Sequence, residues 1–347
     1  MYRCLQLAQM GAGYVAPNPM VGAVLVYDDS IIGEGFHQQY GQAHAEVNCI
    51  NSVTDENKQL IAKSTLYVSL EPCVHFGKTP PCADLIIKNN IPKVVIGCRD
   101  SYDEVNGKGI EKLKAAGVKI IVGVLPGEAI MLNKRFFTFH QQQRPYIILK
   151  WAQSNDKKIA ATGNERIFIS NEFTNRLVHQ WRSEEAAIMV GTNTALKDDP
   201  ALTTRLVTGN NSVRLVIDMD LKLPASLQLF DGVVKTMVFN AVKQEEGEMI
   251  SFYQLDKKEK VIPQILEALY KQKIQSVIIE GGAKLLQSFI DEDLWDEARV
   301  ITNVEMTIGG GIGAPELKNK KLIKEEISGT DKIEYFLNSG YNDIFIR

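Results

Sequence analysis

The chain carries two separate series of short apolar runs, and amphipathic stretches alternate with the runs in each series. Runs of this length that are bounded by turn residues predict strands, and the amphipathic stretches predict helices. The first series predicts strands at residues 21–27, 31–37, 64–70, 93–97 and 118–124. It predicts helices at residues 2–10, 44–50, 81–89 and 110–116. Strands and helices that alternate at this spacing indicate an α/β three-layer domain.

A polar stretch, Gln141-Gln-Gln143, ends the first series, and the pattern restarts at Tyr146. We therefore expect two domains, 1–143 and 144–347. The second series predicts strands at residues 146–152, 186–190, 213–218, 236–240, 276–280 and 299–304, with helices from about 170 and over 262–271. Most of these runs are continuously apolar, which is typical of a buried, largely parallel sheet. Ligands of such sheets bind beyond the carboxyl ends of the strands.

Composition limits the class of protein. The 347 residues are enough for two domains of ordinary size, and 45% apolar with 23% charged residues is typical of a soluble globular protein. A net charge of -3 gives no basic excess for binding nucleic acid. Because there is neither an apolar run long enough to span a membrane nor a signal-peptide pattern near the start, we expect a cytoplasmic protein without membrane contact.

Three metal-ligating side chains and one carboxylate occur in two short motifs. His44 and Glu46 lie in His44-Ala-Glu46, and Cys73 and Cys82 lie near the ends of the segment 72–82. One imidazole and two thiolates leave the fourth position of a tetrahedral zinc open for water, as in catalytic zinc sites. Zinc lowers the pKa of such a water, and a nearby carboxylate can carry its proton to a leaving amine. The motifs therefore predict a catalytic zinc site with Glu46 as the proton carrier.

The remaining cysteines suggest no disulfide framework. Five cysteines are an odd number, and Cys4, Cys49 and Cys98 have no ligand-like spacing, so we expect reduced thiols packed in the core. The stiff Pro80-Pro81 pair starts the helix predicted at residues 81–89 and puts Cys82 in its first turn, where the helix dipole and free N–H groups favour a thiolate. A structural metal site or an oxidised pair of Cys73 and Cys82 is the alternative.

The spacing of the two cysteines points to a family. Nucleobase deaminases have His-x-Glu followed by Pro-Cys-x-x-Cys, but here eight residues separate Cys73 from Cys82. The longer form Pro-Cys-x-His-x-Gly-x-Thr-Pro-Pro-Cys, matched at residues 72–82, resembles the deaminase domain of the bifunctional riboflavin-biosynthesis deaminase/reductases. This resemblance implies a cytidine-deaminase-like fold. His44 and Glu46 are two residues apart and would not share a face within a helix, so we expect them at a helix start.

Three polar residues near these motifs are candidates for contact with the substrate. Asn18 lies in Pro-Asn-Pro-x-Val-Gly at residues 17–22, which also resembles the family; an Asx turn is its alternative role. His75 and Lys78 lie between the two cysteines. We expect Lys78 to contact a phosphate or a polar ring edge, unless it is a solvated loop residue. The family's loop opening Asp-Pro-Asn-Pro is here Asp100-Ser-Tyr-Asp103.

Three motifs of the second domain lie at or just beyond predicted strands, at residues 150–156, 191–205 and 280–282. Paired glycines at a strand-to-helix turn let a phosphate approach backbone N–H groups. Together the motifs resemble the reductase half of the same enzymes, which has a dihydrofolate-reductase-like fold and uses NADPH. The family pattern Lys-x-Ala-x-Ser-x-Asp-Gly is kept from Lys150 to Asp156, but Lys157 replaces the glycine.

The resemblance implies a role for each matched position. Contacts with the dinucleotide are implied for Ala152, Ser154, Phe168, Ser170, Thr194, Asp198, Gly281 and Gly282. Contacts with the substrate are implied for Lys150, Arg182, Leu202, Arg205 and Glu280. Guanidinium groups suit phosphate oxygens, so Arg182 and Arg205 are expected to hold the substrate phosphate. Arg182 could instead be a solvent-exposed helix residue.

By this resemblance the chain is a bifunctional enzyme, expected as a homodimer paired through its reductase domains. The first domain would deaminate 2,5-diamino-6-(5-phosphoribosylamino)pyrimidin-4(3H)-one by zinc-dependent hydrolysis. The second would reduce the ribosyl group with NADPH, giving 5-amino-6-(5-phosphoribitylamino)uracil. One alternative is a nucleic-acid deaminase with an accessory domain, which the charge balance and the reductase motifs disfavour. The other is a non-catalytic zinc protein with a nucleotide-binding domain, which the presence of Glu46 and Lys150 disfavours.

Overall fold

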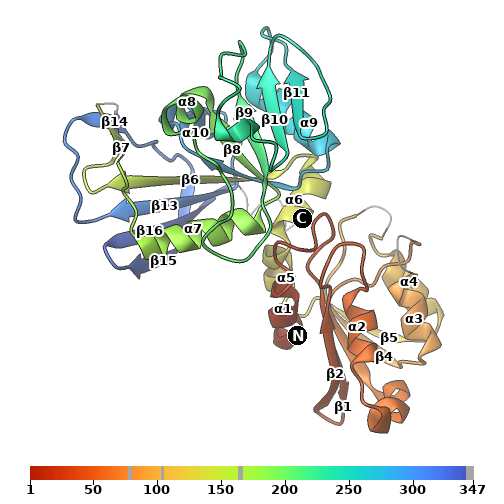
Figure 1. Cartoon of the computed structure of the whole chain (residues 1–347). Helices are drawn as coiled ribbons and strands as arrows, with labels where there is room; N and C mark the ends of the chain where they lie inside the picture. Colours follow the sequence, from red (N-terminus) through yellow and green to blue (C-terminus); the bar gives the residue numbers. More distant parts are fainter. Residues whose placement is uncertain (77–79, 103–104, 163–166, 341–347) are drawn as a thin grey trace. The chain divides into compact units, whose positions relative to one another are not determined.

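The computed structural model of the chain describes residues 1–76, 80–102, 105–162 and 167–340. The chain divides into two compact units, Met1–Gln143 and Arg144–Arg347 (Figure 1). Each unit has its own sheet and its own buried apolar clusters.

The first unit is built on a five-stranded sheet. Its order is β2 (Ser30–Phe36), β1 (Gly22–Tyr27), β3 (Thr65–Leu70), β4 (Lys93–Cys98) and β5 (Lys119–Val122). Strand β1 is antiparallel to both of its neighbours, whereas β3, β4 and β5 are parallel. The parallel half therefore directs the ends of β3 and β4 to the same edge of the sheet.

Helices cover both faces of this sheet. They are α1 (Tyr2–Gln9), α2 (Ala45–Asn51), α3 (Cys82–Lys88), α4 (Lys108–Ala115), α5 (Pro126–Leu132) and α6 (Lys134–Gln142), with a 3₁₀ helix at Asp55–Lys63. Alternate strand residues such as Leu25 and Val68 pack with the buried sides of α2, α3 and α4. Val24, on the opposite face, packs with Cys4 and Leu7 of α1. Successive residues of a strand point to opposite faces, so these contacts place a layer of helices on each face of the sheet. The expected three-layer fold is confirmed.

The second unit is built on a nine-stranded sheet. Its order is β11 (Ile250–Gln254), β10 (Thr236–Asn240), β9 (Val213–Ile217), β8 (Ala187–Gly191), β12 (Ser276–Glu280), β6 (Tyr146–Ser154), β13 (Glu297–Asn303), β16 (Asp331–Asn338) and β15 (Lys320–Ser328). The seven strands from β11 to β13 are parallel, and β16 and β15 extend the sheet antiparallel. A separate small sheet pairs β7 (Lys158–Ala161) with β14 (Gly311–Gly313).

The parallel part of this sheet brings the carboxyl ends of β6, β8 and β12 to one edge. The helices of the unit are α7 (Glu172–Glu184), α8 (Thr192–Asp198), α9 (Val261–Lys271) and α10 (Ala283–Asp291), with a 3₁₀ turn at Gln228–Phe230. Apolar faces of α9 and α10 pack against β6, β8 and β12 in one large buried cluster. Helix α8 occupies part of the segment 191–205, for which no helix was expected, and β11, β15 and β16 were not expected either.

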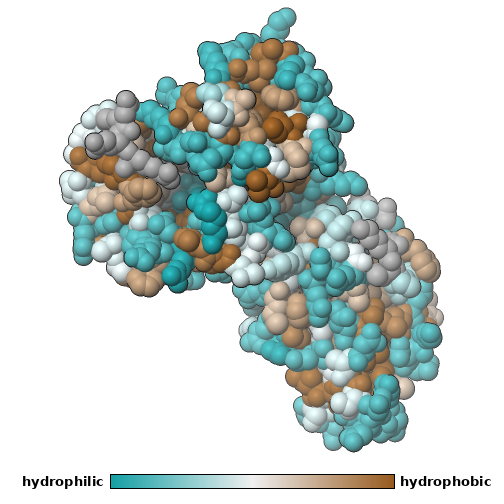
Figure 2. Space-filling view, in the orientation of Figure 1, coloured by the Kyte–Doolittle hydropathy of each residue, from teal (hydrophilic) through white to brown (hydrophobic). Residues whose placement is uncertain are grey.

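Hydrophilic residues cover much of the molecular face drawn in Figure 2, with smaller apolar areas between them. Among the described helices, none has the length and apolar character that a membrane span requires. Phe168, Phe173 and Ile327 are each about 70% exposed. Scattered exposed apolar side chains of this kind are normal on protein surfaces.

Candidate active sites

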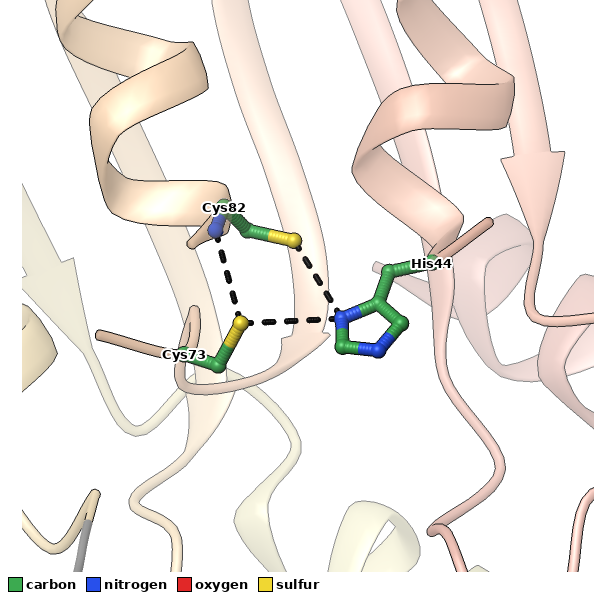
Figure 3. Close-up of side chains that lie close together, drawn as sticks. All are labelled: His44, Cys73 and Cys82. Carbon is green, nitrogen blue, oxygen red and sulfur yellow. Dashed lines mark hydrogen bonds between the residues drawn. The ribbon is translucent and has the colours of Figure 1, made fainter. Parts of the chain in front are cut away.

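The three predicted metal ligands lie together in the first unit (Figure 3). His44 directly precedes α2, Cys73 follows β3 in the next loop, and Cys82 is the first residue of α3. The Nδ1 atom of His44 is 3.6 Å from Sγ of Cys73 and 3.4 Å from Sγ of Cys82. The three ligand atoms lie within 4.8 Å of one another, and this N/S donor set fits a zinc ion.

The loop between the cysteines is tied to the start of α3. The backbone N–H of Cys82 donates to Sγ of Cys73 over 3.4 Å, and the N–H of Ala83 donates to the Cys73 carbonyl over 3.1 Å. A hydrogen bond from the Cys82 thiol, with help from His44, lowers the pKa of Cys73 to about 4, while the pKa of Cys82 is raised. The helix start thus contributes a backbone N–H group to the Cys73 sulfur as well as carrying Cys82. A bound cation would favour the thiolate of both.

Glu46 is a buried carboxyl group next to these three ligands. It lies in the first turn of α2 and is 2% exposed. Burial raises the pKa of Glu46, the nearby Cys73 acts in the same direction, and His44 opposes both. His44 itself has an extended backbone at the helix N-cap, which explains how residues two apart in sequence reach one site. A buried carboxyl with a raised pKa can both accept and donate a proton near neutral pH.

Asn18 is held by a histidine that we did not predict. The Nδ1 of the buried His37 lies 3.0 Å from the Ala43 carbonyl and therefore carries a proton. Its Nε2 then accepts from the Asn18 side-chain amide over 3.1 Å, which leaves Oδ1 of Asn18 as the group available to a substrate. The rings of His37 and His44 also meet edge to face, with centroids 5.2 Å apart. Only its place just after the returning strand could have singled out His37.

His75 makes a contact between aromatic rings. Its ring lies edge-on to Tyr102, with centroids 6.0 Å apart, and Tyr102 in turn lies against His140 of α6. Within the described residues, the buried Nδ1 of His75 has no hydrogen-bond partner. Lys78 lies outside the described residues. Tyr102, which stands in the loop that departs from the family pattern, and His140 were both missed by sequence reasoning.

In the second unit, a buried carboxylate contacts two positively charged residues that were predicted to bind the substrate. Glu280, at the end of β12, accepts from Nε and Nη2 of Arg182, both over 2.7 Å, and its Oε2 is 3.3 Å from Nζ of Lys150. Burial alone would raise the pKa of Glu280, but Arg182 and Lys150 lower it to about 2. Arg182 is only 15% exposed, so it is not a solvated helix residue. Lys150 and Glu280 are paired neighbours on adjacent strands, which explains their contact.

His179, one turn before Arg182 on α7, links this cluster to the loop that follows α8. Its Nδ1 accepts from the backbone N–H of Arg205 over 2.9 Å. Burial, together with the charges of Arg182 and Arg205, lowers the pKa of His179 to about 4. Leu202 of this loop is 4% exposed and adopts a φ of +52°. Sequence reasoning predicted Arg205 and Leu202 but gave no sign of the histidine that holds their loop.

The glycine pair after β12 lies against α8. Gly281 and Gly282 have φ angles of +89° and +80°, a region that favours glycine. A Cβ on Gly281 would lie 2.9 Å from Cγ2 of Thr194, so only glycine allows this close approach. Gly282 forms the N-cap of α10, and Asp198 is the last residue of α8. Three of the predicted dinucleotide contacts, Thr194, Gly281 and Gly282, are thus neighbours.

The other predicted dinucleotide contacts lie in the last part of β6 and in the segment before α7. The hydroxyl of the buried Ser154 donates to Asp156 over 2.5 Å and accepts from the N–H of Lys158 over 3.1 Å, so this serine shapes the turn after β6. Ala152 is a half-buried residue of β6. Phe168 is 70% exposed, and Ser170 lies just before the N-cap of α7.

Comparison with known proteins agrees with both sites. Residues 1–98 match the family model described as the cytidine and deoxycytidylate deaminase zinc-binding region. Residues 145–328 match the model described as the RibD C-terminal domain. The chain is 37% identical to riboflavin biosynthesis protein RibD of Aquifex aeolicus, over 97% of each chain. It is 33% identical to the Escherichia coli protein of that name, over 86% of this chain and 84% of the relative.

Solved structures give the same result. One is the diaminohydroxyphosphoribosylaminopyrimidine deaminase/5-amino-6-(5-phosphoribosylamino)uracil reductase of Thermotoga maritima, with a TM-score of 0.89, 35% identity and 97% coverage of each chain. Acinetobacter baumannii RibD matches with a TM-score of 0.88, 30% identity and 97% coverage of each chain.

The fold and the two sites define a zinc-dependent deaminase of the cytidine-deaminase class fused to an α/β reductase. The chain belongs to the RibD family of bifunctional riboflavin-biosynthesis enzymes. It deaminates 2,5-diamino-6-(5-phosphoribosylamino)pyrimidin-4(3H)-one and then reduces the ribosyl side chain to give 5-amino-6-(5-phosphoribitylamino)uracil, with Zn²⁺ and NADPH as cofactors. The predicted family, fold class, two-step activity and cofactors are confirmed.

Proposed function

We propose that His44, Cys73 and Cys82 hold the zinc ion and that Glu46 is the proton carrier of the deaminase. The observation that supports this most is the convergence of one imidazole nitrogen and two thiol sulfurs beside a buried carboxyl. When bound there, zinc supplies an activated water. Glu46 would pass one proton from that water to the ring nitrogen, and would then pass the proton of the hydroxyl formed at the carbon to the amine that departs as ammonia. Its raised pKa suits this exchange, because the same group must hold a proton and release it.

In our proposal, Asn18, His75 and Lys78 contact the pyrimidine substrate. Asn18 offers its Oδ1 because His37 occupies its amide group. His75 offers the buried Nδ1, and Lys78 offers a positive charge to a phosphate or a ring edge. An acceptor, an imidazole and a cation suit a polar ring that carries amino groups and a phosphate.

For the reductase, the proposed substrate contacts are Lys150, Arg182, Leu202, Arg205 and Glu280. Besides burial, the charges of Arg182, Arg205 and Lys150 lower the pKa of His179, and Glu280 opposes them. An excess of positive charge suits the phosphate, and the carboxylate suits sugar hydroxyls. Glu280 occupies two nitrogens of Arg182, so Arg205 is the guanidinium with more freedom to follow the phosphate.

The proposed dinucleotide contacts are Ala152, Ser154, Phe168, Ser170, Thr194, Asp198, Gly281 and Gly282. NADPH supplies the hydride for reduction at carbon 1 of the ribosyl group. The left-handed glycine pair at the start of α10 leaves room for a phosphate to reach the backbone N–H groups there. Ser154 would act mainly through the turn that it holds.

We further propose residues 1–143 as the deaminase domain and 144–347 as the reductase domain. A homodimer paired through the reductase domains, which acts in the cytoplasm without nucleic-acid partners, completes the proposal. The reducing compartment is supported by the five cysteines, all of which are free thiols. The absence of a basic excess in the net charge of -3 supports a small-molecule substrate.

The test is to measure ammonia release and NADPH oxidation separately in the wild type, Glu46→Gln and Glu56→Gln. Loss of a positioned proton carrier should slow ammonia release about 100-fold or more. Reduction of the deaminated intermediate should be unchanged in Glu46→Gln, and the exposed Glu56→Gln control should behave as the wild type. Each protein should hold one zinc per chain.

Normal ammonia release by Glu46→Gln would refute the role of this carboxylate. Zinc retained at full occupancy in Cys73→Ser would refute the ligand set independently of Glu46.

A further inference from the structure

Glu71 is a buried acidic residue that lies two positions before the zinc ligand Cys73 and takes no part in the chemistry derived above. It is 4% exposed, directly after β3. Its Oε2 accepts from the backbone N–H groups of Asp100 over 3.2 Å and Gly107 over 2.9 Å. Its Oε1 accepts from the N–H groups of Gly109 over 3.0 Å and Ile110 over 3.2 Å. One side chain thus satisfies four backbone donors that lie 29 to 39 residues away in sequence.

Three of these donors belong to the start of α4. Gly107 is the N-cap of this helix, which begins at Lys108, and glycine has no side chain that could cap it. The first N–H groups of a helix lack partners within the helix, and a negative charge placed there is favourable. Glu71 therefore caps α4 from the strand that leads into the zinc site.

The backbone at the start of α4 is tightly packed against the segment that leads to Cys73. A Cβ on Gly109 would lie 2.1 Å from the carbonyl oxygen of Pro72, the residue between Glu71 and Cys73. The backbone at the start of α4 is therefore in direct contact with the peptide that carries the ligand. Asp84 of α3 and Lys112 of α4 also form an ion pair at 2.5 Å, so α4 is tied to the helix that begins with Cys82.

We propose that Glu71 is a positioning residue for the zinc site, one that fixes Cys73 by anchoring its loop to the N-terminus of α4. The inference rests on the proposed function of Cys73 as a zinc ligand. Its physical basis is that a carboxylate offers acceptors to all four donors, whereas an amide of the same shape turns its NH₂ group toward two of them. Glu71→Gln thus keeps the shape of the side chain and breaks the anchor.

The experiment measures zinc release from the full-length, zinc-loaded protein into a chromophoric chelator, together with both activities. Outer partners of zinc ligands typically change metal affinity or activity by about 10- to 100-fold. We expect Glu71→Gln to release zinc at least about tenfold faster, with a parallel fall in ammonia release. Reduction of the deaminated intermediate should not change. Glu111→Gln, an exposed residue of the same helix turn, is the matched control and should match the wild type.

A second variant changes the other partner of this contact, the start of α4. Gly109→Ala keeps the Glu71 carboxylate but forces the start of α4 away from Pro72, so it should also release zinc faster. If Glu71→Gln does not fold, Gly109→Ala decides the matter. Wild-type zinc release and ammonia release in whichever variant is folded would overturn the proposal. Failure of the ligand assignment would look different, because Cys73→Ser would then keep its zinc whatever happens at Glu71.

Discussion

At the scale of single residues, His179 shows how a buried neutral imidazole can serve a cationic site. Its pKa is lowered to about 4 by burial and by Arg182 and Arg205, whereas an unfolded histidine has a pKa of about 6.5. Between these values the unfolded chain binds a proton that the folded chain does not bind. The stability from His179 is therefore present above about pH 6.5 and is lost as the pH falls toward 4.

This predicts a stability difference that depends on pH. Asparagine can still accept the Arg205 N–H but does not titrate, so His179→Asn should lose less stability than the wild type between pH 7 and pH 5. Urea unfolding followed by tryptophan fluorescence can test this, since all three tryptophans lie beyond residue 144 and report on the second unit. Parallel pH profiles for the two proteins would show that folding does not lower the pKa of this imidazole.

The residue scale also shows what a sequence can reveal about a site. His44, Glu46, Cys73 and Cys82 were predictable because their side-chain chemistry and short spacing limit the metal and the reaction. His37, Glu71 and His179 were not predictable. Their roles depend on contacts with backbone groups or side chains distant in sequence, and no local sequence pattern indicates such a partner.

At the scale of elements, the turn between β6 and β7 contains a substitution that is expected to lower the stability of the folded chain. Lys157 stands where the family has glycine, and its φ is +57°. The turn keeps its form because the N–H of Lys157 donates to the Ser154 carbonyl over 2.9 Å, while Asp156 accepts from the N–H groups of Ile308 and Gly309. A left-handed conformation costs a non-glycine residue about 1–2 kcal/mol, partly offset by the greater freedom of glycine in the unfolded chain.

We therefore expect Lys157→Gly to raise the free energy of unfolding by about 0.5–1 kcal/mol. Lys158→Gly, one residue later in β7, should lower it by a similar amount, because glycine weakens a strand. Urea unfolding with tryptophan fluorescence measures both changes. A Lys157→Gly variant less stable than the wild type would mean that the lysine side chain contributes more than its backbone conformation costs.

The sequence predicted the central elements better than the peripheral ones. The apolar runs of β10 and β12 are buried on both faces, so composition alone located them. Strand β15, Lys320–Ser328, is mostly exposed and rich in charge, and it exists through its pairing with β16 at the edge of the sheet. Helix α8 was overlooked because its first turn carries threonine and asparagine, which are equally common in loops.

At the scale of the whole molecule, the proposed residues divide cleanly between the two units. Every proposed deaminase residue lies within Met1–Gln143, and every proposed reductase residue lies within Arg144–Arg347. Each reaction thus has a complete set of groups in one unit. We infer that destroying one site should leave the other intact, and that the deaminated intermediate can reach the reductase through solution.

Mixing two inactive variants tests both statements. Glu46→Gln keeps the reductase, and Lys150→Ala keeps the deaminase, so neither alone should convert the diaminopyrimidine to the ribityl product. Their mixture should form this product after a lag that shortens as the concentration of Glu46→Gln rises, because the intermediate must be captured from solution. Ammonia release by the mixture without product would mean that the intermediate passes only between sites of the same assembly. Loss of ammonia release in Lys150→Ala alone would mean instead that the two units depend on each other, since Lys150 has its ion-pair contact with Glu280 in the second unit.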